Sequence, residues 1–137
     1  MTANTTQVGG THYAAEYQHW DLVWDCQMGY FPGQITKYVM RHTKKNGVED
    51  LRKSLHVTQK YMEVLNTLGN LQSPVRATPH IITDRLEAVA LYCKANSVHS
   101  IIERLILTEL SLPHEYNAVV HVETLINQLI KEYPSCI

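Results

Sequence analysis

Residues 29–51, GYFPGQITKYVMRHTKKNGVEDL, decide how this chain is organised. Pro32 suits the first turn of a helix, where its missing N–H costs nothing, and Gly47 suits the left-handed residue that closes one. We therefore predict a helix over roughly residues 32–45. At helical spacing its packing face carries Ile35, Tyr38, Val39 and His42, and a second face carries the cations Lys37, Arg41, Lys44 and Lys45.

Helical spacing continues on both sides of this stretch. We predict a short helix over residues 19–28, in which Trp20 and Trp24 pack into the core, and a long helix over residues 48–68. A linker with two prolines follows over residues 69–80. Thr83 or Asp84 then starts a fourth helix, and two more span about residues 98–110 and 113–133. No segment of useful length alternates with period two, so the predicted fold is all-α, a compact bundle of about six helices.

The length of 137 residues is that of one ordinary domain. We divide it into a helical region with a glycine-rich N-terminal segment (1–69) and a helical extension (70–137) packed in the same domain. The three cysteines stand far apart, which favours a reducing compartment over a disulfide framework. No apolar run reaches the length of a membrane span, and the polar residues 1–19 do not form a signal peptide.

The sequence lacks the motifs that mark several common classes of catalytic and binding site. The chain contains neither GxxxxGK[ST] nor GxGxxG, the two glycine-rich phosphate motifs. Its eight histidines include no HExxH pair, and the acidic residues are explained by helix ends, so we predict no metal site. No GxSxG motif indicates a nucleophilic serine.

The cationic face is the remaining feature that indicates a ligand. Lys37, Arg41, Lys44 and Lys45 have no acid among them, so they repel one another and favour an anionic ligand. The alternative interpretation is a solvated helix face. The net charge of −1 disfavours nucleic acid and favours a small phosphorylated ligand. Arg41 can hold a phosphate through two donors, and Tyr30 and Tyr38 are candidates to stack on a base.

The order of motifs is similar to that of a family. A family of small bacteriophage proteins described as nucleotide kinases is resembled by the following residues in order: Gly10-Thr11-His12-Tyr13, then Asp21 and Val23, then Gly29-Tyr30-Phe31-x-Gly33-Gln34-Ile35-x-Lys37-Tyr38-x-x-Arg41-x-x-Lys44-Lys45, then Glu49-Asp50-Leu51-x-Lys53 and Tyr61. Its best-known member, from phage T7, phosphorylates dTMP and dGMP without a P-loop. The resemblance covers about residues 9–65. It implies a nucleotide-phosphate site made by His12, Tyr13, Lys37, Arg41, Lys44 and Lys45, and it assigns no catalytic base.

Three functions stay open at this level. The resemblance implies a deoxynucleoside monophosphate kinase in the cytoplasm of an infected bacterial host. The second hypothesis is a non-catalytic counter-defence protein that sequesters a nucleotide-derived immune signal, such as a cyclic oligonucleotide or an ADP-ribose derivative. The third is a structural or protein-binding helical protein. We expect no bound cofactor, although a kinase substrate would bring Mg²⁺. We also expect a homo-oligomer, because the apolar seam of residues 48–65 is long.

Overall fold

The computed structural model describes residues 16–68 and 78–133, and these ranges form six α-helices without a β-strand. The all-α prediction is therefore confirmed. The helices are α1 (His19–Asp25), α2 (Tyr30–Arg41), α3 (Val48–Leu68), α4 (Pro79–Ala95), α5 (Ile101–Ser111) and α6 (Tyr116–Lys131). None of the helices in the described ranges combines the length and the hydropathy that a membrane span requires.

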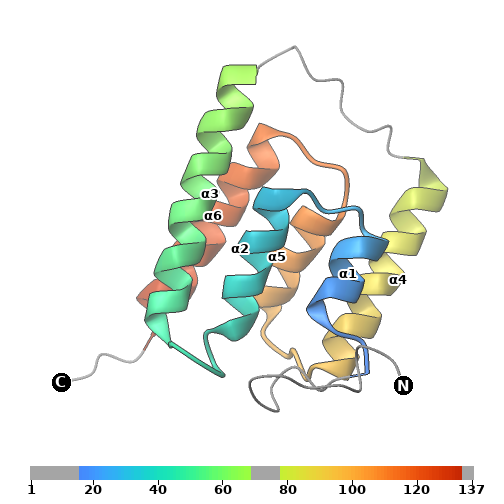
Figure 1. Ribbon diagram of the computed structural model, residues 1–137, viewed down its shortest axis with the longest axis horizontal. Helices are drawn as coiled ribbons and strands as arrows, with labels where there is room; N and C mark the ends of the chain where they lie inside the picture. Colours follow the sequence, from blue (N-terminus) through green and yellow to red (C-terminus); the bar gives the residue numbers. More distant parts are fainter. Residues whose placement is uncertain (1–15, 69–77, 134–137) are drawn as a thin grey trace.

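Four of the helices form a closed ring. α2 packs on α3, α3 on α6, α6 on α5, and α5 returns to α2. Neighbours in this ring run in opposite directions, as Figure 1 shows. α4 packs on the outer side of α5, and α1 covers α4. The ends of the four ring helices therefore meet at two opposite ends of the molecule, and both ends become relevant below.

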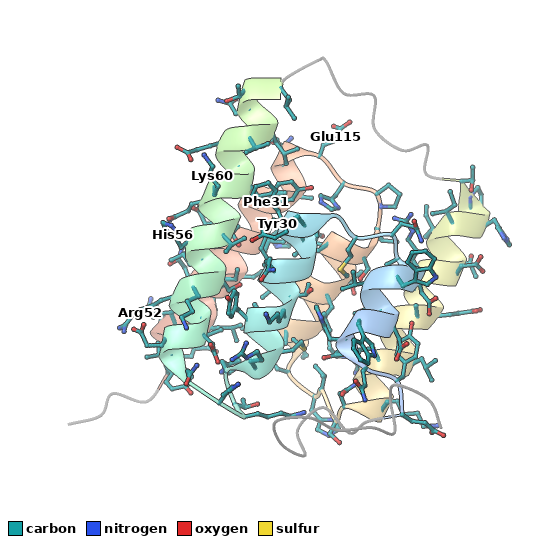
Figure 2. The ribbon with its side chains drawn as sticks, viewed as in Figure 1. Tyr30, Phe31, Arg52, His56, Lys60 and Glu115 are labelled. Carbon is teal, nitrogen blue, oxygen red and sulfur yellow. The ribbon has the colours of Figure 1, made fainter. Side chains whose placement is uncertain are left out.

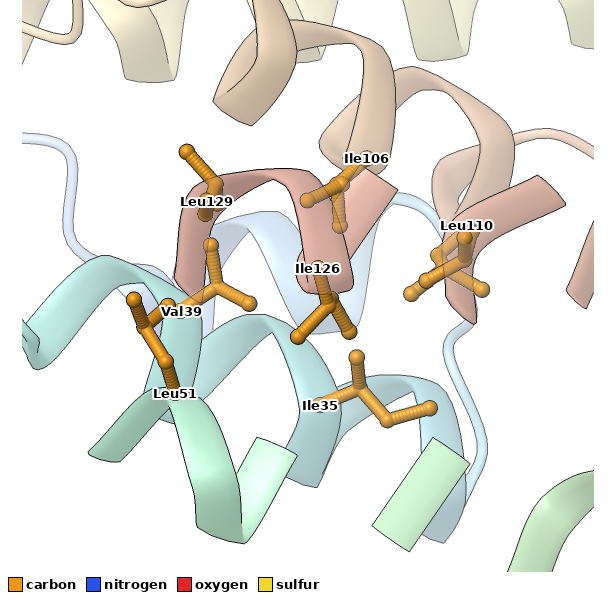
Figure 3. Close-up of a cluster of buried hydrophobic side chains, with 8 residues drawn as sticks. Ile35, Val39, Leu51, Ile106, Leu110, Ile126 and Leu129 are labelled. Atoms are coloured by element: carbon orange, nitrogen blue, oxygen red, sulfur yellow. The ribbon is translucent and has the colours of Figure 1, made fainter. Parts of the chain in front are cut away.

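The ring encloses the larger of two apolar clusters (Figure 3). Leu51 of α3 and Ile126 of α6 are fully buried there, together with the predicted packing residues Ile35 and Val39 of α2. His42 is buried as predicted, at 8% exposure. Full burial of one such aliphatic side chain stabilises the fold by about 1.5–3 kcal/mol. Three of the four predicted packing residues are thus buried, whereas Tyr38 is only partly buried and lies outside the apolar cluster.

The second cluster lies between α1, α4 and α5 and corrects the prediction for the tryptophans. In this cluster, Leu22 of α1 and Cys26, which follows α1, are buried together with Val89 and Cys93 of α4. Trp20 and Trp24 are 54% and 75% exposed, so the predicted core position of both was wrong. The physical reason is that α1 is short and Leu22 is its one fully buried residue, which leaves much of its circumference in solvent.

Most of the predicted helix boundaries differ from the observed ones by one to three residues, and two boundaries differ by more. α2 ends at Arg41 rather than near residue 45, and residues 42–47 form a turn. α4 begins at Pro79 rather than at Thr83 or Asp84, because Thr78 caps it with a hydroxyl that accepts a hydrogen bond from the Ile81 N–H (3.3 Å). Of the predicted linker, residues 69–77 lie outside the described residues.

Candidate functional site

Three cations meet around one aromatic ring where α2 faces α3. The Nζ atoms of Lys37 and Lys53 lie 5.4 and 5.8 Å from the centre of the Tyr38 ring, and the guanidinium carbon of Arg41 lies 5.6 Å from it. We call Lys37, Tyr38, Arg41 and Lys53 the cationic cluster. The negative face of a tyrosine ring attracts each cation by about 0.5–2 kcal/mol. One ring cannot cancel three full charges, so the cluster retains a strong positive potential.

The close packing of α2 and α3 brings these residues together. The buried Ser54 hydroxyl donates a hydrogen bond across the interface to the Ile35 carbonyl (3.1 Å). Its side chain is small enough for the two backbones to approach each other. In an antiparallel pair, residues at equal distances from the turn lie opposite each other, and Ile35 and Ser54 each stand seven residues from the turn at 42–47. Ser54 therefore fixes the register that places Lys53 beside Tyr38.

The cations of the cluster are not neutralised by neighbouring acids. Among the described residues, no carboxylate oxygen lies within 4.0 Å of the charged nitrogens of Lys37, Arg41 or Lys53. The Nε atom of Arg41 is buried and has no hydrogen-bond acceptor in the same part of the chain. A buried donor without an acceptor costs about 1–3 kcal/mol. An anionic ligand beside the cluster would reduce the mutual repulsion of the three cations.

The two acidic residues that follow the turn, Glu49 and Asp50, both interact with residues close to them in the sequence. The buried Asp50 carboxylate accepts hydrogen bonds from the Asn46 backbone N–H (3.1 Å) and from its side-chain amide (3.5 Å). Glu49 pairs with Arg52 at 3.1 Å on the exposed face of α3. The Asp50 bonds hold residues 42–47 as a turn. Lys44 and Lys45 are therefore exposed in that turn, beyond the end of α2, instead of continuing its cationic face.

His19 of α1 contacts α2 beside Lys37, the first cation of the cluster. Its Nε2 is 2.7 Å from the Thr36 hydroxyl, which itself donates to the Pro32 carbonyl at 2.9 Å. His19 and Thr36 therefore share a hydrogen bond. Burial, with a smaller effect of the Lys37 ammonium, lowers the pKa of His19 to about 4. His19 is consequently neutral at pH 7 and adds no charge beside Lys37.

The structure brings together some of the predicted site residues and separates others. Lys37, Tyr38 and Arg41 belong to one cluster, with Lys44 and Lys45 in the turn that follows. Tyr30 lies at the other end of α2, eight residues or about 12 Å from Tyr38. The remaining predicted residues, His12 and Tyr13, lie outside the described residues.

Lys53 is the site residue that the sequence prediction omitted. It lies on a different predicted helix from the other cations, and periodicity within one helix says nothing about its partner. The available signal was the motif Glu49-Asp50-Leu51-x-Lys53, which is part of the resemblance described above.

No group of three or more His, Cys, Asp or Glu side chains gathers within the described residues in a way that would hold a metal ion. Comparisons with protein-family models, with curated proteins and with solved structures each find no match. The resemblance to phage nucleotide kinases therefore stays a prediction from the motifs that carry it.

Proposed function

We propose that the chain binds a nucleotide or nucleotide-derived small molecule, with its phosphate at the cationic cluster. The observation that supports this most directly is the convergence of Lys37, Arg41 and Lys53 on Tyr38 with no carboxylate in contact among the described residues. Arg41 offers two parallel donors to a phosphate, and the lysines supply point charge. The exposed Lys44 and Lys45 extend the positive surface.

A substitution series tests the phosphate site. We expect Lys53→Ala to weaken binding of dTMP, dGMP or ATP roughly 10- to 100-fold, because a hydrogen bond to a charged group contributes about 1.5–3 kcal/mol. The matched control is Lys60→Ala on the outer face of the same helix, where Lys60 pairs with Glu63 at 3.8 Å (Figure 2). Isothermal titration calorimetry measures both. Equal affinities for the two variants would contradict the proposal.

Catalysis is the finer proposal, and it rests on the resemblance. In a nucleoside monophosphate kinase, the cluster would stabilise the charge that develops on the transferred phosphoryl group, with Lys37 or Arg41 as the closest contact. The resemblance adds His12 and Tyr13 to the phosphate contacts, and it implies the cytoplasm of an infected bacterium as the location. Incubation with MgATP and dTMP or dGMP should yield the diphosphates. If none forms at high enzyme concentration, the kinase proposal fails.

Sequestration without catalysis is the second candidate, and the engagement of Glu49 and Asp50 in local bonds favours it. A kinase needs groups that orient the acceptor or hold Mg²⁺, whereas the two acids beside the turn are used to shape the turn itself. A sequestering protein would bind a cyclic dinucleotide or ADP-ribose and release it unchanged when denatured. Recovery of a modified product would contradict simple sequestration.

Self-association remains part of the proposal. Sedimentation velocity across a hundredfold range of protein concentration distinguishes a monomer from a dimer. A sedimentation coefficient that stays at the monomer value at every concentration would contradict self-association.

A further inference from the structure

A cavity of about 940 Å³ lies at the end of the molecule opposite the cationic cluster. It is bounded by the start of α2, the last turns of α3, α4 and the connection between α5 and α6. The lining side chains that matter here are Tyr30, Phe31, Tyr61, Arg85 and His114. Its volume is typical of small-molecule sites, which combine apolar walls with a few polar groups.

One wall of the cavity is aromatic. Phe31 stacks on Tyr61 with ring centres 5.3 Å apart and an angle of 13° between the planes. Tyr30 meets the edge of Phe31 at 5.5 Å and is 72% exposed at the mouth. Figure 2 shows Tyr30 and Phe31 at the first turn of α2, beside α3. An exposed tyrosine adjoining a stacked pair offers a flat face to a planar ligand.

The hydrogen bond between His114 and Tyr61 determines which polar atoms of the same wall donate and which accept. The Nδ1 atom of His114 lies 2.8 Å from the Leu112 carbonyl, which can only accept, so Nδ1 carries the proton. Its Nε2, 2.7 Å from the Tyr61 hydroxyl, therefore accepts the tyrosine proton. Burial lowers the pKa of His114 and raises the pKa of Tyr61, which keeps both groups neutral. Because its proton is committed to His114, the Tyr61 oxygen meets a ligand as an acceptor.

Arg85 adds a donor to the lining of the cavity. Arg85 of α4 donates from one Nη to the Ser111 carbonyl at 3.2 Å, which anchors its guanidinium at the cavity. A guanidinium carries five N–H donors, so donors remain for a ligand. The cavity thus presents flat aromatic faces, an acceptor oxygen and a cationic donor within one space.

We propose that this cavity binds a planar heteroaromatic ring that carries both an N–H donor and an acceptor nitrogen or oxygen, as a nucleobase does. The ring would stack on Tyr30 and Phe31, donate to the Tyr61 oxygen and accept from Arg85. Along α2, Tyr30 and Arg41 are eleven residues or about 16 Å apart. The cavity is therefore a site separate from the cationic cluster, and it does not depend on phosphate binding there.

Nucleosides test this proposal, because they have the ring and no phosphate. Adenosine, guanosine and cytidine are titrated separately into the protein, and affinity is measured by calorimetry or by saturation-transfer NMR. We expect at least one of them to bind with a saturable isotherm. Tyr30→Ala should weaken that binding roughly tenfold, since stacking on one aromatic side chain carries an effect of this size. Tyr61→Phe, which keeps the ring and removes the acceptor oxygen, should weaken it roughly fivefold.

The controls separate this site from the phosphate site. Tyr38→Ala and Lys53→Ala should leave nucleoside affinity unchanged, and circular dichroism checks that every variant is folded. The proposal is overturned if no nucleoside saturates the protein at millimolar concentration, or if Tyr30→Ala and Tyr61→Phe bind as the unmodified chain does. It is also overturned if Lys53→Ala removes nucleoside binding, because the base would then sit at the cationic cluster. Failure of phosphate binding leaves these outcomes unaffected.

Discussion

His19 is the single residue with the clearest consequence for stability. Its pKa is about 4 in the folded chain and about 6.5 in the unfolded chain, because burial disfavours the charged imidazolium. Between these values the unfolded state binds more protons, so stability falls as the pH falls from 6.5 towards 4. The neutral ring contributes its full stabilisation above pH 6.5. We expect it to account for a loss of about 3 kcal/mol between pH 7 and pH 4.

Urea denaturation of the unmodified chain and of His19→Gln at these two pH values measures the effect. Glutamine can still form a hydrogen bond with Thr36 but does not titrate. The difference in unfolding free energy between pH 7 and pH 4 should shrink in the variant, and subtraction cancels the carboxylates that titrate in both chains. Identical pH dependences would show that His19 is not the source.

At the scale of the element, the α2–α3 hairpin is held by its turn. Gly47 has φ of +61°, a conformation that costs other residues about 1–2 kcal/mol. A Cβ at this position would also lie 3.1 Å from the Tyr133 hydroxyl. We therefore expect Gly47→Ala to lower the free energy of unfolding by about 1–2 kcal/mol, as measured by urea denaturation.

Gly33→Ala is the matched control for that substitution. Gly33 is inside α2, where an added Cβ would meet Val23 only at ordinary contact distance (3.9 Å). Alanine favours a helix by about 1 kcal/mol over glycine, so this variant should not be destabilised. If both alanine variants behave alike, the positive φ of Gly47 does not determine the stability of the turn.

The same hairpin shows what sequence patterns could predict at this scale. The left-handed conformation of Gly47 and the buried face of Ile35 and Val39 followed from local rules. The position at which α2 ends did not follow from local rules, because Asp50, in the next helix, accepts a hydrogen bond from the Asn46 backbone N–H. A side chain four residues away thus overrides the helical pattern of residues 42–45, and that pattern was the basis for placing Lys44 and Lys45 on the helix face.

At the scale of the whole molecule, the two apolar clusters are joined through α5. Neighbouring residues Ile106 and Leu107 of α5 belong to different clusters, and Met40 of α2 contacts both. We expect the clusters to unfold together. Leu51→Ala in the larger cluster should cost about 3 kcal/mol, and it should accelerate labelling of the buried Cys93 thiol in the other cluster about a hundredfold.

Labelling with a thiol reagent, resolved by mass spectrometry at Cys93, measures this coupling. The control is Leu91→Ala, which lies two residues from Cys93 but is 51% exposed and should change the rate little. If Leu51→Ala leaves the Cys93 rate unchanged, then the clusters open independently.

Relations between distant segments are what the sequence could not supply. Helical spacing predicted the number of helices and most of their buried faces. It gave no information that Lys53 would join Lys37 and Arg41, or that Tyr61 would meet His114, because these pairs depend on which helices become neighbours. The exposed Trp20 and Trp24 belong to the same class, since their environment depends on which side of α1 packs against the other helices.

The direction of α2 has a consequence for how an anion is held. Aligned peptide dipoles place about half a negative charge at the C-terminal end of a helix, and Arg41 is the last residue of α2. The carbonyl oxygens at this end attract the three cations while no ligand is bound, but they repel the negative charge of a phosphate. Backbone sites for phosphate normally use the opposite, N-terminal end. Affinity at this position therefore depends on side-chain charge that exceeds the backbone field, which is why a third cation from α3 matters.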